Sequence, residues 1–133
     1  VREGLSLLTS FRGEIWGKLD AGTDAWFRQI NGSSMSLETI QNNLEMTVKD
    51  FPMQIQTMLC KIGENFPSQV EIDAYLKRLE KIYYAGKENF KGVQLYGVVR
   101  QTALDTVSAL PKDFLENVAE QIRNSLPVCV NVF

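Results

Sequence analysis

The feature that most constrains this chain is a helix-start signal followed by one long apolar stripe. Ser68 and Glu71 have the spacing of a capping box, in which a serine caps the helix and a glutamate follows three residues later. Apolar residues then recur at steps of three and four until Gly86, which is the spacing of one helix face. The stripe consists of Ile72, Tyr75, Leu76, Leu79, Ile82 and Tyr83. The pattern predicts an amphipathic helix that must bury this stripe against other elements.

The same spacing recurs along most of the chain. Proline is accepted in the first turn of a helix but breaks the hydrogen-bond ladder further in, so Pro52 and Pro111 are expected to begin helices. Thr23 and Ser36 are expected to act as helix caps because their side-chain oxygens can accept from free backbone N–H groups. Helices are thereby predicted for residues 5–19, 23–30, 36–51, 52–62, 68–85 and 111–126.

Residues 92–100 fit two structures. Val93, Leu95 and Val99 alternate with other residues as in a strand. A helical pattern also starts at Val93 and runs unbroken to Leu110. We favour the helix, because this run is longer than a typical strand.

Together these patterns predict an all-α protein. The expected fold is a compact bundle of six to seven short amphipathic helices with an extended C-terminal tail. A length of 133 residues favours one helical domain over residues 1–133. The chain is 44% hydrophobic and 23% charged, which is typical of a globular protein. It has no apolar run of 18 residues, so no transmembrane segment is expected.

The tail and the two cysteines suggest a covalent link. Residues 128–133 alternate in polarity but are too few to form a sheet alone, so they need a surface to lie against. We expect a disulfide between Cys60 and Cys129, the alternative being two buried free thiols. Closing a loop of about 70 residues would stabilise the fold by roughly 4 kcal/mol. A disulfide would indicate a secreted, extracellular protein, and Asn31 then begins a glycosylation sequon in a predicted turn.

The composition argues against catalysis. The chain has no histidine, which removes the commonest general base, the histidine-dependent nucleophile pairs and the usual zinc and haem ligand sets. No glycine-rich phosphate loop or calcium-binding loop is present. A net charge of −2 gives no basic surface for nucleic acid. We therefore expect no enzyme activity, no cofactor, no metal ion and no nucleic-acid partner.

Aromatic residues are the candidate binding residues. Trp26 and Phe27 are adjacent on a short predicted helix, so one of them should lie at the surface or at the rim of an opening. Tyr83 and Tyr84 lie among basic residues that could contact an anion or a membrane surface, or could form the solvated side of a helix. The basic residues are Lys77, Arg78, Lys81, Lys87 and Lys91.

The sequence therefore favours a secreted, non-enzymatic interaction protein, including an effector or toxin-like protein. Its partner would be another protein, with exposed aromatic residues as anchors. The alternatives are a helical carrier of an apolar small molecule or lipid, a structural or assembly domain, and a protein that contacts a membrane surface.

Overall fold

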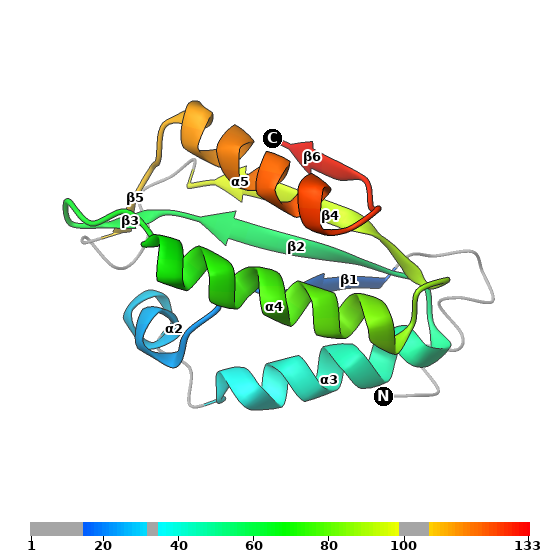
Figure 1. Ribbon diagram of the computed structural model, residues 1–133. Helices are drawn as coiled ribbons and strands as arrows, with labels where there is room; N and C mark the ends of the chain where they lie inside the picture. Colours follow the sequence, from blue (N-terminus) through cyan, green and yellow to red (C-terminus); the bar gives the residue numbers. More distant parts are fainter. Residues whose placement is uncertain (1–14, 32–34, 99–106) are drawn as a thin grey trace.

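The protein has an α/β fold, so the prediction of an all-α bundle is wrong (Figure 1). The computed structural model describes residues 15–31, 35–98 and 107–133. In these residues the chain forms four helices, a four-stranded parallel sheet and a separate two-stranded antiparallel sheet. The elements are β1 (Ile15–Lys18), α2 (Asp24–Ile30), α3 (Leu37–Asp50), β2 (Met53–Leu59), β3 (Lys61–Ile62), α4 (Gln69–Ala85), β4 (Phe90–Gly97), β5 (Val107–Ser108), α5 (Lys112–Ser125) and β6 (Val130–Val132).

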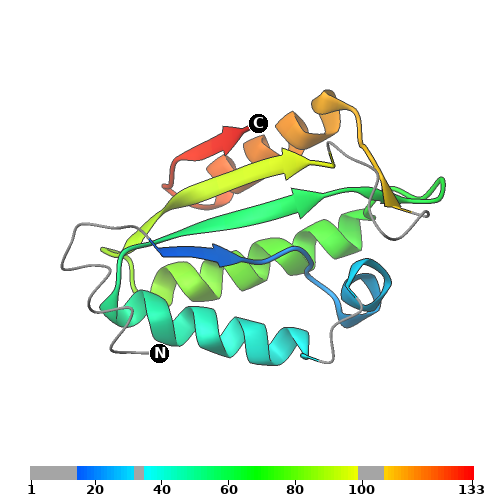
Figure 2. The same cartoon turned by 180° about the vertical axis from the view of Figure 1, so that it is seen from behind.

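The main sheet has the strand order β1-β2-β4-β6, and every neighbouring pair is parallel. Chain order and spatial order agree, and helices α3, α4 and α5 all return on the same face of the sheet (Figure 1). Seen from behind, the opposite face carries no described helix (Figure 2). Both faces of a parallel sheet are usually covered, so a face without a described helix is unusual, and we refer to it as the bare face.

The helices form where the sequence supplies local start signals. The hydroxyl oxygens of Thr23, Ser36 and Ser68 each accept a hydrogen bond from the backbone N–H three residues later in the chain, at 3.1–3.2 Å. These caps satisfy donors that a helix start otherwise leaves free. The predicted helices in these three places and after Pro111 are therefore confirmed.

Three predicted helices are replaced by strands. Residues 52–62 form β2 and the short β3, and the described part of residues 92–110 forms β4 and β5. The described end of the predicted helix 5–19 contains β1, while residues 5–14 and 99–106 lie outside the described residues. Along β2, buried and half-buried residues alternate strictly, because successive side chains point to opposite faces. The burial pattern of β2 therefore repeats every two residues, and the helix-like spacing of its apolar residues was a coincidence.

One apolar core lies between the sheet and its three covering helices. Ile55 and Val93 from the sheet and Leu79, Ile82 and Ile122 from the helices are fully buried. Each such side chain contributes about 1.5–3 kcal/mol by leaving water. Much of the predicted stripe of α4 therefore does face the core, but its partner is a sheet rather than only other helices.

The C-terminal tail is extended, and it pairs with β4 as strand β6. The predicted disulfide is wrong, because Cys60 and Cys129 are both free. The register explains why: Val130 is aligned with Val93, and Val93 with Ile55. Cys129 therefore lies six residues back along the sheet from Cys60, a separation of about 20 Å at 3.3 Å per residue. A disulfide needs Cα atoms within about 7 Å.

No helix among the described residues is long and apolar enough to cross a membrane, in keeping with the expected absence of a transmembrane segment.

Candidate functional site

The bare face of the main sheet carries a mixed set of aromatic, amide and charged side chains. They come from alternate positions of β1, β2 and β4, whose other positions are buried under the helices. The residues on this face are Trp16, Lys18, Gln54, Gln56, Met58, Gln94 and Tyr96. Most sheets with one solvated face present largely polar side chains there. Exposed aromatic residues among amides are a reason to look for a ligand.

The strand register arranges these residues in rows. Lys18, Gln56, Gln94 and Asn131 are register partners on successive strands and form one row across the sheet. Tyr96 lies two residues beyond Gln94, one row nearer the carboxyl ends of the strands.

A hollow of about 330 Å³ lies over these rows. Its lining comes from three strands and the residue after β6, and consists of Trp16, Gln56, Gln94, Tyr96 and Phe133. Trp16 is 47% exposed and Phe133 is 69% exposed, so two large rings face solvent. The hollow is open to solvent, and its lining is mostly apolar with a few polar groups, as in small-molecule sites.

The amide groups in the hollow are partly held in place. The Nε2 of Gln94 donates to the Oε1 of Gln54 at 3.1 Å. This contact joins the neighbouring strands β2 and β4 and uses one N–H of the Gln94 amide. Because a carboxamide has both donors and an acceptor, this face can bond to a ligand that offers either kind of group.

A charged pair lies at the β1 edge, beside the hollow but outside its lining, where Lys18 is the register partner of the lining residue Gln56. The Lys18 Nζ lies 3.8 Å from the Asp20 Oδ2 and 5.7 Å from the centre of the Tyr96 ring. Asp20 accepts from the backbone N–H of Met58 at 2.8 Å. Burial raises the pKa of the Asp20 carboxyl, while the Met58 N–H and the Lys18 charge lower it. A hydrogen bond with Tyr96 raises the pKa of Lys18, and burial opposes that change.

The loop that carries Asp20 is anchored from α4 by one buried carboxylate. One oxygen of Glu71 accepts from the Gly22 N–H at 2.7 Å, and the other accepts from the N–H and hydroxyl of Thr23 at 2.8 and 2.7 Å. Arg78 donates its Nε–H to the Gly22 carbonyl at 2.7 Å. Burial raises the pKa of Glu71, and the bonds from Thr23 and Gly22 lower it. The β1–α2 loop is thus held at both its N–H and carbonyl groups.

Gly22 is required for this anchoring. A Cβ at this position would clash with the Tyr75 N–H nitrogen and the Glu71 carbonyl oxygen, both of which are α4 backbone atoms. Only glycine lets the loop lie directly against the helix.

A second polar contact supports the sheet from its covered side. The Thr57 hydroxyl donates to the Leu19 carbonyl at 2.7 Å and lies 2.7 Å from the Tyr75 hydroxyl. Since the only Thr57 proton is used on Leu19, Tyr75 donates to Thr57. Burial raises the pKa of Tyr75, and the hydrogen bond with Thr57 opposes this change.

Burial, and then the Asp20 charge, raise the pKa of the Cys60 thiol to about 11.

The structure separates the predicted binding residues. Phe27 is buried, and Trp26 is partly buried against the core. Tyr83 is also partly buried, and Tyr84 is 64% exposed with its ring 5.1 Å from that of Tyr83. The first pair follows the loop that touches the first half of α4, whereas the second lies at the end of α4, so they do not form one site. A binding role for these four residues stays a prediction.

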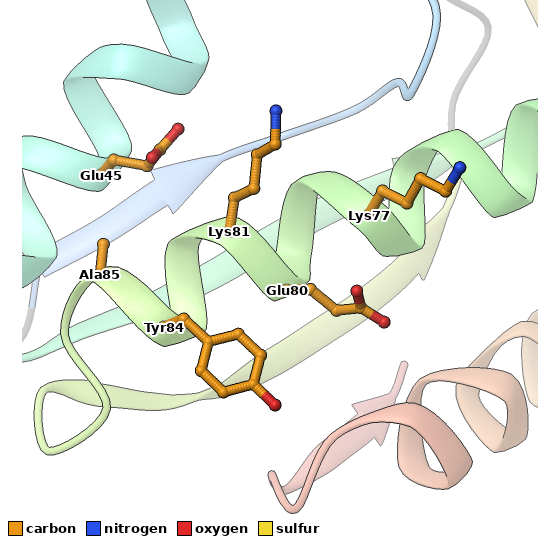
Figure 3. A pocket seen from close by; sticks show the side chains of 6 residues that line it. All are labelled: Glu45, Lys77, Glu80, Lys81, Tyr84 and Ala85. Carbon is orange, nitrogen blue, oxygen red and sulfur yellow. The ribbon is translucent and has the colours of Figure 1, made fainter.

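A second hollow, of about 510 Å³, lies over α4 and contains part of the predicted basic region (Figure 3). It is lined by Glu45, Lys77, Glu80, Lys81, Tyr84 and Ala85. Two carboxylates and two ammonium groups give its lining no net charge. Lys77 and Lys81 point to one side of α4, whereas Glu80 and Tyr84 point to the other (Figure 3). These side chains diverge, so they do not define a ligand.

The remaining predictions concern modification and metals. Asn31 ends α2, and its N–H donates to the Phe27 carbonyl at 2.9 Å. Its glycosylation stays a prediction. In residues 15–31, 35–98 and 107–133, no group of three His, Cys, Asp or Glu side chains is placed to hold a metal ion.

No protein-family model matches the chain, and no curated protein matches it. The function has to be argued from the site.

Sequence reasoning missed the bare-face residues because it assigned their strands to helices. The signal was present: Gln54, Gln56 and Met58 alternate with buried residues, as do Gln94 and Tyr96. Period two with a polar or aromatic residue at every second position is typical of a half-buried strand.

Proposed function

We propose that the protein binds a small, flat organic molecule in the hollow over the bare face of its sheet. One observation carries this proposal: aromatic and amide side chains from three parallel strands line a single hollow of about 330 Å³ on the face of the sheet opposite the helices. Rings such as Trp16 and Tyr96 offer flat apolar surface, and Gln56 and Gln94 offer hydrogen bonds in the same space.

Of the two partner classes expected from the sequence, this site favours a small molecule. The ligand is not the purely apolar or lipid cargo of a helical carrier, because two amides line the hollow. The expected disulfide was the main reason to predict secretion, and both cysteines are free. The proposal therefore assigns no compartment, toxin activity or reaction.

The test uses benzamide, which combines a flat ring with an amide. Saturation-transfer NMR should show transfer from the protein to the benzamide ring protons. Tyr96→Ala should reduce this transfer severalfold, because it removes a ring from the hollow. Tyr84→Ala is the matched control, since Tyr84 is exposed on α4, away from this face. Equal transfer in both variants, or none in the wild type, would contradict the proposal.

Protein binding is the second candidate, and the exposure of Trp16 and Phe133 favours it. Aromatic residues are enriched in the centres of protein interfaces. Here the partner would cover the bare face. If it were a second copy, size-exclusion chromatography with light scattering would give twice the mass of 15.1 kDa. A Trp16→Ser variant would then return to the monomer mass, whereas a monomeric wild type would exclude pairing with a second copy.

A further inference from the structure

The charged groups at the border of the hollow differ in how far a ligand can reach them. The Lys18 side chain is 56% exposed, whereas the Asp20 side chain is 18% exposed. Both come from the β1 edge, and Lys18 shares a row with Gln56 and Gln94, two residues of the lining. A ligand lying on the amides therefore meets the ammonium group before the carboxylate.

Asp20 is also already engaged by the protein. Its Oδ1 accepts from the Met58 N–H at 2.8 Å. The Lys18 Nζ is 3.8 Å from the other oxygen, which is longer than a hydrogen bond between these atoms. The two charges attract each other, but the contacts with Asp20 and Tyr96 use at most two of the three N–H donors of Lys18.

The ammonium group of Lys18 lies close to the Tyr96 ring. The Nζ lies 5.7 Å from the centre of the Tyr96 ring, within the range of a cation–π contact. A flat ring stacked in the hollow beside Tyr96 would hold its substituents within reach of this ammonium group. An acidic substituent would complement the charge, and a basic one would be repelled by it.

We propose that the ligand of this hollow is a flat ring compound that carries one acidic group, with the acid bound by Lys18 and the ring bound by Trp16 and Tyr96. This inference rests on the proposed function and adds the charge of the ligand class. Gln56 and Gln94 then form hydrogen bonds with uncharged substituents of the ring.

Benzoate and benzamide test it, because they share a ring and differ in charge. Their dissociation constants are measured by NMR titration at low salt. Benzoate should bind about threefold more tightly than benzamide, which is the size of a partly exposed charge contact. The preference should fall to about one in Lys18→Met, which keeps most of the side-chain length but removes the charge. Lys81→Met, an exposed lysine on α4, should keep the threefold preference.

The outcomes separate the two proposals. If neither compound binds, or if Tyr96→Ala binds as well as the wild type, the proposed function fails. If both bind with equal affinity, or if Lys18→Met keeps the preference for benzoate, the ring site stands and the acidic ligand class is wrong. If Lys81→Met loses the preference instead, benzoate binds at the α4 hollow and the assignment to Lys18 is overturned. A dimer that hides Trp16 and excludes both compounds would replace both proposals with self-association.

Discussion

Glu71→Gln tests whether one buried carboxylate holds the β1–α2 loop. Glutamine has nearly the same shape, but it offers one acceptor oxygen where glutamate offers two. In the protein, one oxygen of Glu71 serves Gly22 and the other serves Thr23. Whichever way the glutamine amide is turned, its NH₂ group faces a backbone N–H at 2.7–2.8 Å, and that buried donor loses its partner.

The expected loss of stability is about 3 kcal/mol. Two hydrogen bonds still have an acceptor oxygen, but that oxygen is no longer charged. Each of them loses about 0.5–1 kcal/mol, because charged hydrogen bonds are roughly twice as strong as neutral ones. The donor left without an acceptor costs about 1–3 kcal/mol more. For a chain of 133 residues this corresponds to a fall in melting temperature of about 10 °C.

The assay is urea unfolding followed by circular dichroism, with Asp73→Asn as the control. Asp73 lies on the same helix and also accepts a hydrogen bond, from Gln69 at 2.8 Å, but it is exposed. The control should change stability by less than about 0.5 kcal/mol. If Glu71→Gln costs no more than Asp73→Asn, the carboxylate does not hold the loop and our account of this region is wrong.

Two further predictions concern buried groups. With a thiol reagent at pH 7.5, the native protein should show one fast-reacting thiol, the exposed Cys129. Cys60 should react only on unfolding, because burial raises its pKa to about 11. Fast reaction of both thiols would show that Cys60 is not buried. Tyr75 ionises near pH 10 when unfolded but stays protonated when folded, so above pH 10 the unfolded state binds fewer protons. The free energy of unfolding should therefore fall above pH 10 by up to about 1.4 kcal/mol per pH unit from Tyr75 alone. Tyr75→Phe should reduce this slope, and an unchanged slope in that variant would contradict the assignment.

The helices were predictable because their signals are local. Thr23, Ser36 and Ser68 each satisfy a free N–H three residues away, so the short sequence around each cap contains its partner. Strand β2 was not predictable in the same way. Methionine, glutamine and leucine favour helices when isolated. In this protein the pairing of β2 with both β1 and β4 overrides that preference, and these partners lie far away in the sequence.

The candidate site was hidden by the same error. A helix over residues 52–62 places Met58 on the apolar stripe beside Ile55 and Leu59, whereas the strand places Met58 on the opposite face from both. Gln54 and Gln56 would then be solvated helix residues without a function. The disulfide failed for a related reason. Pairing was inferred from the presence of two cysteines and from the tail's need for an anchor, and only the register of β2, β4 and β6 shows their separation.

Glu71 shows how a correct local signal can hide a long-range role. Its own N–H donates to the Ser68 hydroxyl, as the capping box predicts. In a complete capping box the glutamate side chain would return to the serine N–H. Here it reaches Gly22 and Thr23, 49 and 48 residues earlier in the chain, and fixes the loop that follows β1. Asp20 begins that loop and lies beside Lys18 at the border of the hollow. The residue that completes the start signal of α4 therefore also fixes the loop that holds the Asp20 carboxylate beside Lys18.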